Sequence, residues 1–159
     1  MKNLFSLYAL LSAFSSQALA QEELLLSLGT GYAYDESFGH GPYLETSSGL
    51  WLGHTLILLG QYRLETKFSD FDVQNSFDLA LRYPLDVFRF IPWLEAAPVL
   101  TLGDSIDYGG RVGLGLDWLI SRNWHLGFSV HYQKTLESSG IAGGLAFTYR
   151  FEFNNRWAP

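Results

Sequence analysis

The ten residues Gly144-Leu-Ala-Phe-Thr-Tyr-Arg-Phe-Glu-Phe153 decide how the rest of the chain is interpreted. Successive side chains of a β-strand point to opposite faces of the sheet, so every second residue shares a face. One face is wholly large and apolar, whereas the other mixes small residues with charges: Leu145, Phe147, Tyr149, Phe151 and Phe153 against Gly144, Ala146, Thr148, Arg150 and Glu152. A soluble sheet edge with this pattern would aggregate. The pattern is typical of a strand with lipid outside and a narrow polar interior.

The composition restricts the class of protein. The chain has 159 residues, which suits one domain, and 16% of them are charged, fewer than the roughly 25% of an average soluble domain. A net charge of −6 argues against nucleic acid as a partner, because a nucleic-acid interface is basic. The absence of cysteine excludes disulfide bonds, thiolate metal ligands and cysteine nucleophiles. The four histidines are too dispersed in sequence to predict a metal site, and no cofactor is expected.

The N-terminus has the pattern of an export signal. Lys2 supplies a positive charge, Leu4 to Phe14 is apolar, and Ala18-Leu19-Ala20 is a small-x-small cleavage site. Residues 1–20 are therefore predicted to be a cleavable signal peptide. The alternative is a retained membrane anchor, which the short apolar core disfavours.

The rest of the chain repeats the same alternation in about eight stretches of some ten residues. They are expected near residues 23–33, 43–52, 56–66, 76–83, 90–102, 108–118, 124–133 and 144–153. Tilted strands of about nine to eleven residues cross a bilayer, and only a closed barrel leaves no unpaired backbone edge in hydrocarbon. The prediction is an all-β protein: an eight-stranded antiparallel transmembrane up-and-down barrel over residues 21–153, with a short tail at 154–159. The alternative is a soluble lipocalin-like or sandwich protein, which would place its apolar side chains inside.

The connections and the aromatic residues predict an orientation. Bacterial barrels have short periplasmic turns and longer outer loops. Short turns are expected near Gly53, Asp86 and Asn123, and longer loops after Tyr34, Thr66, Gly103 and Thr135. This orientation sorts the aromatic residues into two interfacial belts. The outer belt is Tyr32, Tyr34, Tyr43, Phe68, Phe71, Tyr108 and Tyr132, and the inner belt is Trp51, Tyr83, Phe88, Phe90, Trp93, Trp118, Trp124, Phe151 and Phe153.

The fifth stretch contains Pro98, which is predicted to mark a β-bulge because proline cannot donate to a ladder. The expected outer loops carry a series of carboxylates that disfavours direct contact with anionic lipopolysaccharide, except through divalent cations: Asp35, Glu36, Asp70, Asp72, Asp104, Asp107 and Glu137. Long adhesive or receptor loops are missing.

The closing stretch resembles the signal that the barrel-assembly machinery reads in small bacterial outer-membrane β-barrels, the OmpA-, OmpX- and OmpW-like group. The residues of that signal are Gly144, Phe147, Tyr149 and Phe151. Residues 108–133, with Gly-Leu-Gly-Leu-Asp-Trp and then Ser-Arg-Asn-Trp-His-Leu, resemble the penultimate hairpin of these proteins. The resemblance covers the mature chain and implies a monomer in the bacterial outer membrane, with membrane lipid and the assembly machinery as partners. The tail at 154–159 departs from it, because many members end in an aromatic residue.

The inward faces of the predicted strands carry charges of both signs. An eight-stranded barrel is just wide enough for side chains to fill it, and unpaired buried charges are costly, so these charges are predicted to pair into a polar plug. The alternative is a proton or ion path. Five side chains are expected in the outer half, Arg63, Glu65, Asp78, Arg111 and His131, and six in the periplasmic half, Arg82, Glu95, Asp117, His125, Arg150 and Glu152. Glu23 and Glu45 share the inward face, and inward glycines at 29, 31, 109, 113, 115 and 127 are expected to make room for arginine side chains.

The function expected from these features is a structural, envelope-integrity or interaction role. The alternative is a narrow channel or small-solute transporter, and a lipid A-modifying enzyme is less favoured. A serine nucleophile needs a positioned histidine base and an orienting acid, and the candidate pairs are Ser129 with His131 and His125 with Asp117. The deacylases among small outer-membrane barrels carry a His-x-Ser-Asn run that His131-Tyr-Gln does not match. No catalytic residue is therefore predicted.

Overall fold

The computed structural model describes residues 23–37, 39–52, 55–68, 72–85, 89–103 and 105–152. These residues form eight strands: β1 (Glu23–Asp35), β2 (Gly39–Leu52), β3 (Leu56–Thr66), β4 (Val73–Pro84), β5 (Phe90–Leu102), β6 (Ile106–Leu119), β7 (Trp124–Thr135) and β8 (Ser139–Glu152). They include no helix of the length and hydropathy needed to cross a membrane. The predicted signal peptide at 1–20 and tail at 154–159 lie outside the described residues.

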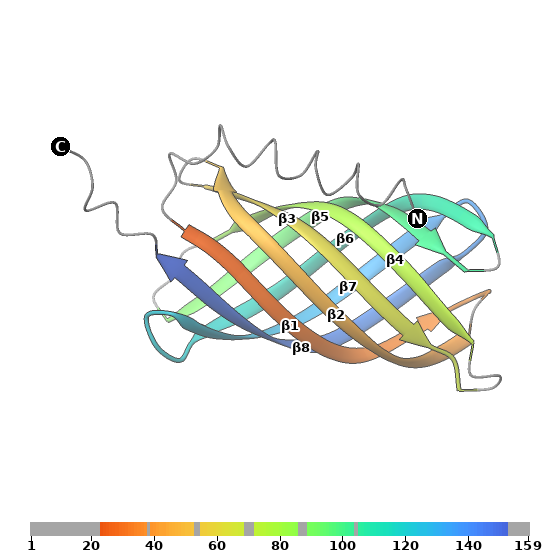
Figure 1. Ribbon diagram of the computed structural model, residues 1–159, viewed down its shortest axis with the longest axis horizontal. Helices are drawn as coiled ribbons and strands as arrows, with labels where there is room; N and C mark the ends of the chain where they lie inside the picture. The colour runs from red at the N-terminus through yellow and green to blue at the C-terminus, as the bar shows by residue number, and fades with distance from the viewer. Residues whose placement is uncertain are drawn as a thin grey trace, which may run out of the picture.

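Every strand is antiparallel to its sequence neighbours, and β8 pairs with β1 from Glu23↔Glu152 to Asp35↔Gly140, which closes the sheet into a barrel (Figure 1). The predicted eight-stranded antiparallel up-and-down barrel is confirmed. Figure 1 shows that β1 begins and β8 ends at the same end of the barrel. That end is called the termini end below, and the opposite end, where β1 meets β2, is called the loop end.

Several strands extend further towards the loop end than expected. β2 begins at Gly39, β4 at Val73 and β8 at Ser139, because cross-strand pairing continues past the apolar part of each strand. Pro98 does not create a bulge, since the β4–β5 register is the same on both sides of it. The ladder only omits the pairs at Ala97 and Pro98, as expected where proline lacks an N–H.

The expected contrast between short turns and long loops is absent. Three to five residues join the strands at the termini end, and three to six join them at the loop end. Backbone hydrogen bonds tie the loops to neighbouring strands, for example from Glu36 N to Ser139 O of β8 at 2.9 Å and from Leu136 N to Tyr108 O of β6 at 3.2 Å. Because the loops are short and hydrogen-bonded, the barrel makes up most of the described structure.

The outward face of the barrel is apolar. Leucine, isoleucine, valine and aromatic side chains remain exposed along seven of the eight strands, and Leu28 and Leu114, for example, are each 58% exposed. On β3 the outward residues are half-buried. Exposed aromatic residues lie near both ends, Tyr32, Tyr34, Phe68, Tyr108 and Tyr132 near the loop end and Tyr83, Phe90, Trp118, Trp124 and Phe151 near the termini end. A continuous apolar band between two aromatic belts matches the hydrocarbon core and its two interfaces.

Three aromatic residues do not belong to these belts. Tyr43 is 5% exposed and Trp93 is 3% exposed, and Trp51 lines a cavity inside the barrel. All three occupy inward positions of their strands, so the prediction that placed them at the membrane interfaces is wrong. Phe71, Phe88 and Phe153 lie outside the described residues.

Candidate functional site

The candidate site is the lumen, and its middle is crossed by what we call the ion-pair layer. Alternation along β2 to β6 places one or more charged residues on the inward face of each strand. The layer consists of Glu45, Arg63, Glu65, Asp78, Arg82, Glu95 and Arg111. Arg63 and Arg111, each 2% exposed, are the largest fully buried side chains among the described residues.

Arg63 is held by carboxylates on either side of it. Its Nη2 and Nε donate to Glu45 Oε2 at 2.6 and 2.9 Å, and its Nη1 donates to Glu65 Oε1 at 3.4 Å. Glu45 lies directly opposite Arg63 in the β2–β3 register. A buried guanidinium with two carboxylates keeps its charge compensated, which is the condition for burying it.

Glu95 is the residue that joins the layer together. Its carboxylate accepts hydrogen bonds from Arg82 at 2.8 and 3.0 Å, from Arg111 at 3.3 Å and from Gln61 at 3.2 and 3.3 Å. His131 Nδ1 lies 3.9 Å from the same carboxylate. The two predicted halves of the polar lumen therefore meet at Glu95.

Arg111 completes the layer. It is ion-paired with Asp78, reaches Glu95, and lies 3.6 Å from Glu45 Oε2. Because Glu45 also binds Arg63, contacts run across the barrel from β2 and β3 to β4, β5 and β6. The layer thus fills the lumen with side chains from five strands.

Aromatic rings pack against two of the arginines. The Arg82 guanidinium lies 3.8 Å from the centre of the Trp93 ring, and the Arg63 guanidinium lies 4.5 Å from the centre of the Tyr43 ring. Such cation–π contacts are favourable and shield the guanidinium face. Sequence reasoning missed both partners by assigning them to the belts, although their inward positions would have identified them.

The expectation that the inward glycines make room for arginine side chains is wrong, because no arginine atom is among the nearest neighbours of a Cβ at any of them, and three of them, Gly31, Gly113 and Gly115, lie against rings instead. A Cβ at Gly115 would collide with the Trp93 indole and lie 2.6 Å from the backbone oxygen of Phe128. A Cβ at Gly144 would collide with the Tyr43 hydroxyl and lie 2.6 Å from Thr30 O. Gly115 and Gly144 therefore leave space for aromatic rings in a narrow lumen.

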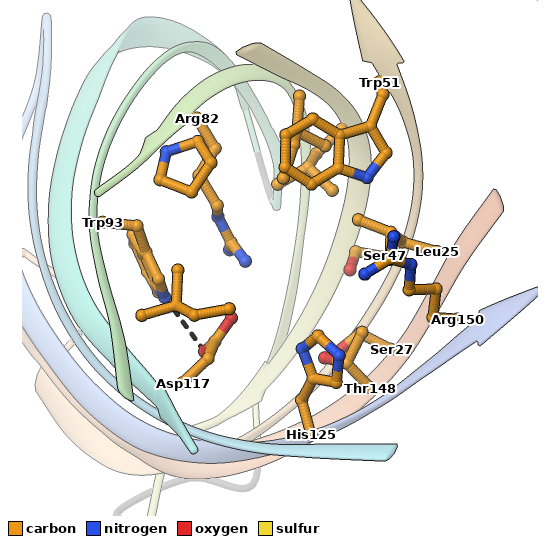
Figure 2. Close-up of a pocket in the computed structure, with 14 residues that line it drawn as sticks. Leu25, Ser27, Ser47, Trp51, Arg82, Trp93, Asp117, His125, Thr148 and Arg150 are labelled. Carbon is orange, nitrogen blue, oxygen red and sulfur yellow. Dashed lines mark hydrogen bonds between the residues drawn. The ribbon is translucent and has the colours of Figure 1, made fainter. Parts of the chain in front are cut away.

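At the termini end the lumen widens into a cavity of about 50 Å³. Figure 2 shows Arg82 and Arg150 on opposite walls, with the His125 ring pointing into the space between them. Arg150 is ion-paired with Glu23 across the β1–β8 seam. This cavity is called the termini-end cavity.

Hydrogen bonds within its wall hold several other side chains. Trp93 Nε1 donates to Asp117 Oδ1 at 3.0 Å, and Thr148 Oγ1 donates to Ser27 Oγ at 3.2 Å. The apolar part of the wall includes Leu25, Trp51, Ile57 and Leu59.

The structure divides the predicted lumen residues between these two regions. Arg63, Glu65, Asp78, Glu95, Arg111 and His131 lie in or against the ion-pair layer, whereas Asp117, His125 and Arg150 line the termini-end cavity and Arg82 touches both. The side chain of Glu152 lies outside the described part of the structure.

The predicted assembly signal lies on β8 beside the seam. Phe147 and Phe151 are exposed on the outward face, and Tyr149 packs against Trp124 of β7 and Phe151, with ring centres 4.7 and 4.4 Å apart. Gly144 faces inward against Tyr43. The recognition of these residues by an assembly machinery stays a prediction.

Three acidic residues of the loop end accept hydrogen bonds from serine hydroxyls. Ser138 donates to Asp35 at 2.8 Å, Ser139 to Glu36 at 2.6 Å and Ser105 to Glu137 at 3.3 Å. Asp70 and Asp104 lie outside the described residues. Across the described ranges, no three histidine, aspartate or glutamate side chains are grouped as a metal ion would require.

The two histidines considered for nucleophilic catalysis are both buried, and His125 lines the termini-end cavity together with Asp117. His131 is 2% exposed, and its ring lies beside Trp93, with ring centres 6.1 Å apart. Within the described residues its Nδ1 has no hydrogen-bond partner, and the same is true of His125 Nε2. Neither of these two nitrogens is therefore hydrogen-bonded to a serine hydroxyl in the described part of the structure.

Comparison with solved structures gives the fold a context. Over 82% of this chain, neisserial surface protein A matches with a TM-score of 0.67 and 20% identity, across 97% of its own length. The N-terminal barrel domain of Pseudomonas aeruginosa OprF matches at 0.66 and 19%, over 82% of this chain and 98% of that one. The attachment invasion locus protein Ail of Yersinia pestis matches at 0.55 and 10%, over 82% and 99%.

No family model and no curated protein matches the sequence. Identities this low show a shared fold and nothing finer. The chain has the fold of the small eight-stranded outer-membrane β-barrels.

Proposed function

We propose that the protein is a small monomeric barrel of the bacterial outer membrane, with a structural or interaction role and a lumen closed to ions. The apolar outward face, the two aromatic belts and the likeness to outer-membrane barrels support the location. The predicted signal peptide supports export, and the termini end is proposed to face the periplasm.

The main support for a lumen closed to ions is the ion-pair layer. Arg63 and Arg111 are 2% exposed and bind carboxylates from several strands. An ion crossing the layer would have to separate these pairs, and separating a buried pair leaves an uncompensated charge. An eight-stranded barrel offers no wider route, because its interior is about the width of the side chains that fill it.

The acidic loop end disfavours adhesion to a polyanion. One neighbour, Ail, has been solved in complex with the heparin analogue sucrose octasulfate. Here the loop end exposes Glu36, Asp72 and Glu137, and carboxylates repel sulfate groups. The proposal also includes no chemical reaction, because His131 is enclosed beside Glu95 and Trp93.

Conductance in planar lipid bilayers tests the closed lumen. The refolded protein is expected to give no channel openings above background, whereas a variant with Arg63→Ala and Arg111→Ala, which empties the centre of the layer, is expected to conduct. Regular openings from the unmodified protein would favour the narrow-channel alternative and overturn the proposal. Gel mobility before and after boiling serves as the control, because each sample must contain folded barrel.

Fractionation tests the location. The protein is expected in the outer-membrane fraction of a Gram-negative cell, shortened at its N-terminus by about twenty residues as a cleaved signal peptide requires. Recovery in the soluble fraction at full length would contradict the proposal.

A further inference from the structure

Three residues that line the termini-end cavity have polar atoms without a hydrogen-bond partner in the described part of the structure. Trp51 Nε1, Arg150 Nε and His125 Nε2 are buried and have no hydrogen-bond partner among the described residues, and all three residues line the cavity. The indole and guanidinium nitrogens are donors only. Whatever satisfies them must therefore be an acceptor.

The charged groups at the cavity wall have both signs. Two guanidinium groups, Arg82 and Arg150, and one carboxylate, Asp117, line the cavity. Asp117 Oδ1 is occupied by Trp93 Nε1. Arg82 and Arg150 are paired with Glu95 and Glu23, which are not among the lining residues, and Arg150 keeps its Nε unpartnered. With these partners counted, the charged groups at the cavity are two guanidinium groups and three carboxylates, so it is the donor nitrogens without partners that call for an acceptor.

The size and position of the cavity limit what fits. A water molecule occupies roughly 10–15 Å³ on the scale used for such cavities, so about 50 Å³ holds a few waters or one small ion. The lining includes Leu25 near the start of β1 and Arg150 near the end of β8, so the cavity lies at the termini end. His125 is 7% exposed and its ring points into the cavity (Figure 2).

We propose that the termini-end cavity binds one small oxyanion, inorganic phosphate or a short carboxylate, which accepts hydrogen bonds from Trp51 Nε1 and Arg150 Nε beside the His125 ring. The ion enters from the termini end and does not cross the barrel, because the ion-pair layer closes the other side. A closed membrane barrel with this cavity is a binding protein for a small anion as well as a structural element.

The tryptophan indoles provide the readout. In the ¹⁵N-labelled protein in detergent micelles, phosphate and acetate are titrated separately at constant ionic strength, with chloride as the reference anion. The indole N–H signal of Trp51, assigned through Trp51→Phe, is expected to shift with saturation. The signals of Trp118 and Trp124, which are exposed on the outward face, are expected to stay in place.

The titrations distinguish phosphate from a carboxylate as the bound anion, and either anion from water. Saturable shifts with phosphate alone identify a tetrahedral oxyanion, and shifts with acetate identify a carboxylate; either supports the proposal. If neither anion moves the Trp51 signal, the cavity holds only water and the proposal is overturned. Equal shifts of Trp118 and Trp124 would indicate adventitious binding only, which also overturns it.

Two variants test the donors. Arg150→Gln removes the charge, and equilibrium dialysis with radiolabelled phosphate is expected to show about tenfold weaker binding or more, the effect of losing a hydrogen bond between charged groups. Lys134→Gln removes one positive charge from an exposed position at the loop end of β7 and is expected to leave binding unchanged. Equal losses in both variants would contradict the site. If Arg150→Gln does not fold, the titration of the unmodified protein decides alone.

Discussion

The inward and outward faces of the same eight strands obey opposite rules. On β6, Arg111 faces the lumen and is 2% exposed, whereas Leu114, three residues later, faces outward and is 58% exposed. In a soluble barrel the leucine would be inside. The difference teaches that the surroundings of this barrel are less polar than its interior, so that charges find partners only inside.

The two faces also differ in how closely their side chains are placed. Inside, each guanidinium of the ion-pair layer is paired with a particular carboxylate. Gly115 and Gly144 each leave space for one aromatic ring. Outside, leucine and phenylalanine side chains meet lipid, which adapts to them. Substitutions that respect hydrophobicity are therefore expected to be tolerated outside and to be costly inside.

The largest effect is expected from Glu95→Gln. The variant keeps the shape but leaves Arg82 and Arg111 without their shared charge, and breaking a buried ion pair costs about 3–5 kcal/mol. Urea unfolding of the refolded protein in lipid vesicles, followed by tryptophan fluorescence, measures the free energy of unfolding. Glu36→Gln, at an exposed carboxylate bonded to Ser139, is expected to change it by less than about 1 kcal/mol. Similar losses of unfolding free energy in both variants would show that the buried ion pairs contribute no more than an exposed carboxylate.

The next effect tests the outward face. Leu114→Arg places a charge in the middle of the apolar band, which costs about 2–4 kcal/mol at the bilayer midplane. Ile106→Arg, on the same face and strand but at the loop end, is expected to cost about 0–1 kcal/mol. The same unfolding assay in vesicles compares them. A cost below about 0.5 kcal/mol for Leu114→Arg, the usual value for the surface of a soluble protein, would refute contact with hydrocarbon.

A smaller effect is expected where a ring packs on a glycine. Gly115→Ala would force its Cβ into the Trp93 indole and the backbone of Phe128, and overpacking costs about 1–3 kcal/mol. A Cβ at Gly60, which lies on the outward side of β3, would be 4.0 Å from its nearest neighbour in Ser48, so Gly60→Ala is expected to be harmless. If both variants unfold at the same urea concentration, close packing of the lumen is wrong.

The smallest effect concerns a hydroxyl pair in the wall of the termini-end cavity. Ser27→Ala removes the acceptor of Thr148, which is expected to cost about 0.5–1.5 kcal/mol. Ser48→Ala, at an exposed outward position of β2, is expected to be neutral or stabilising in vesicles, because it removes a hydroxyl from lipid. The reverse order of the two effects would contradict the assignment of the faces.

Alternation alone was enough to predict most of this arrangement. A strand's side chains have a period of two, so one correct position assigns the whole strand, and the inward charges from Arg63 to Arg150 follow from eight such assignments. The prediction is wrong for residues that it places by their type and not by their position in the alternation. Tyr43, Trp51 and Trp93 were assigned to the membrane interfaces as aromatic residues near strand ends, although their positions in the alternation face the lumen.

Two features of the lumen cannot be predicted from the sequence, for physical reasons. The tilt and stagger of barrel strands shift residues relative to those on neighbouring strands, so the meeting of Arg82 and Arg111 at a single carboxylate, Glu95, required the register. The termini-end cavity depends on the direction of individual side chains such as Arg82 and His125 (Figure 2). No pattern of residue types specifies those directions.

The pairing of Glu23 with Arg150 has a consequence for how the molecule assembles. These residues are 127 positions apart and lie on the first and last strands, so the contact forms only after nearly the whole polypeptide has been synthesised. Interactions between distant parts of a sequence are slow to form, and until this one exists β1 and β8 expose unpaired amide groups that hydrocarbon does not tolerate. Folding and membrane insertion are therefore expected to be completed together. A chain truncated before β8 is expected not to insert stably into the bilayer.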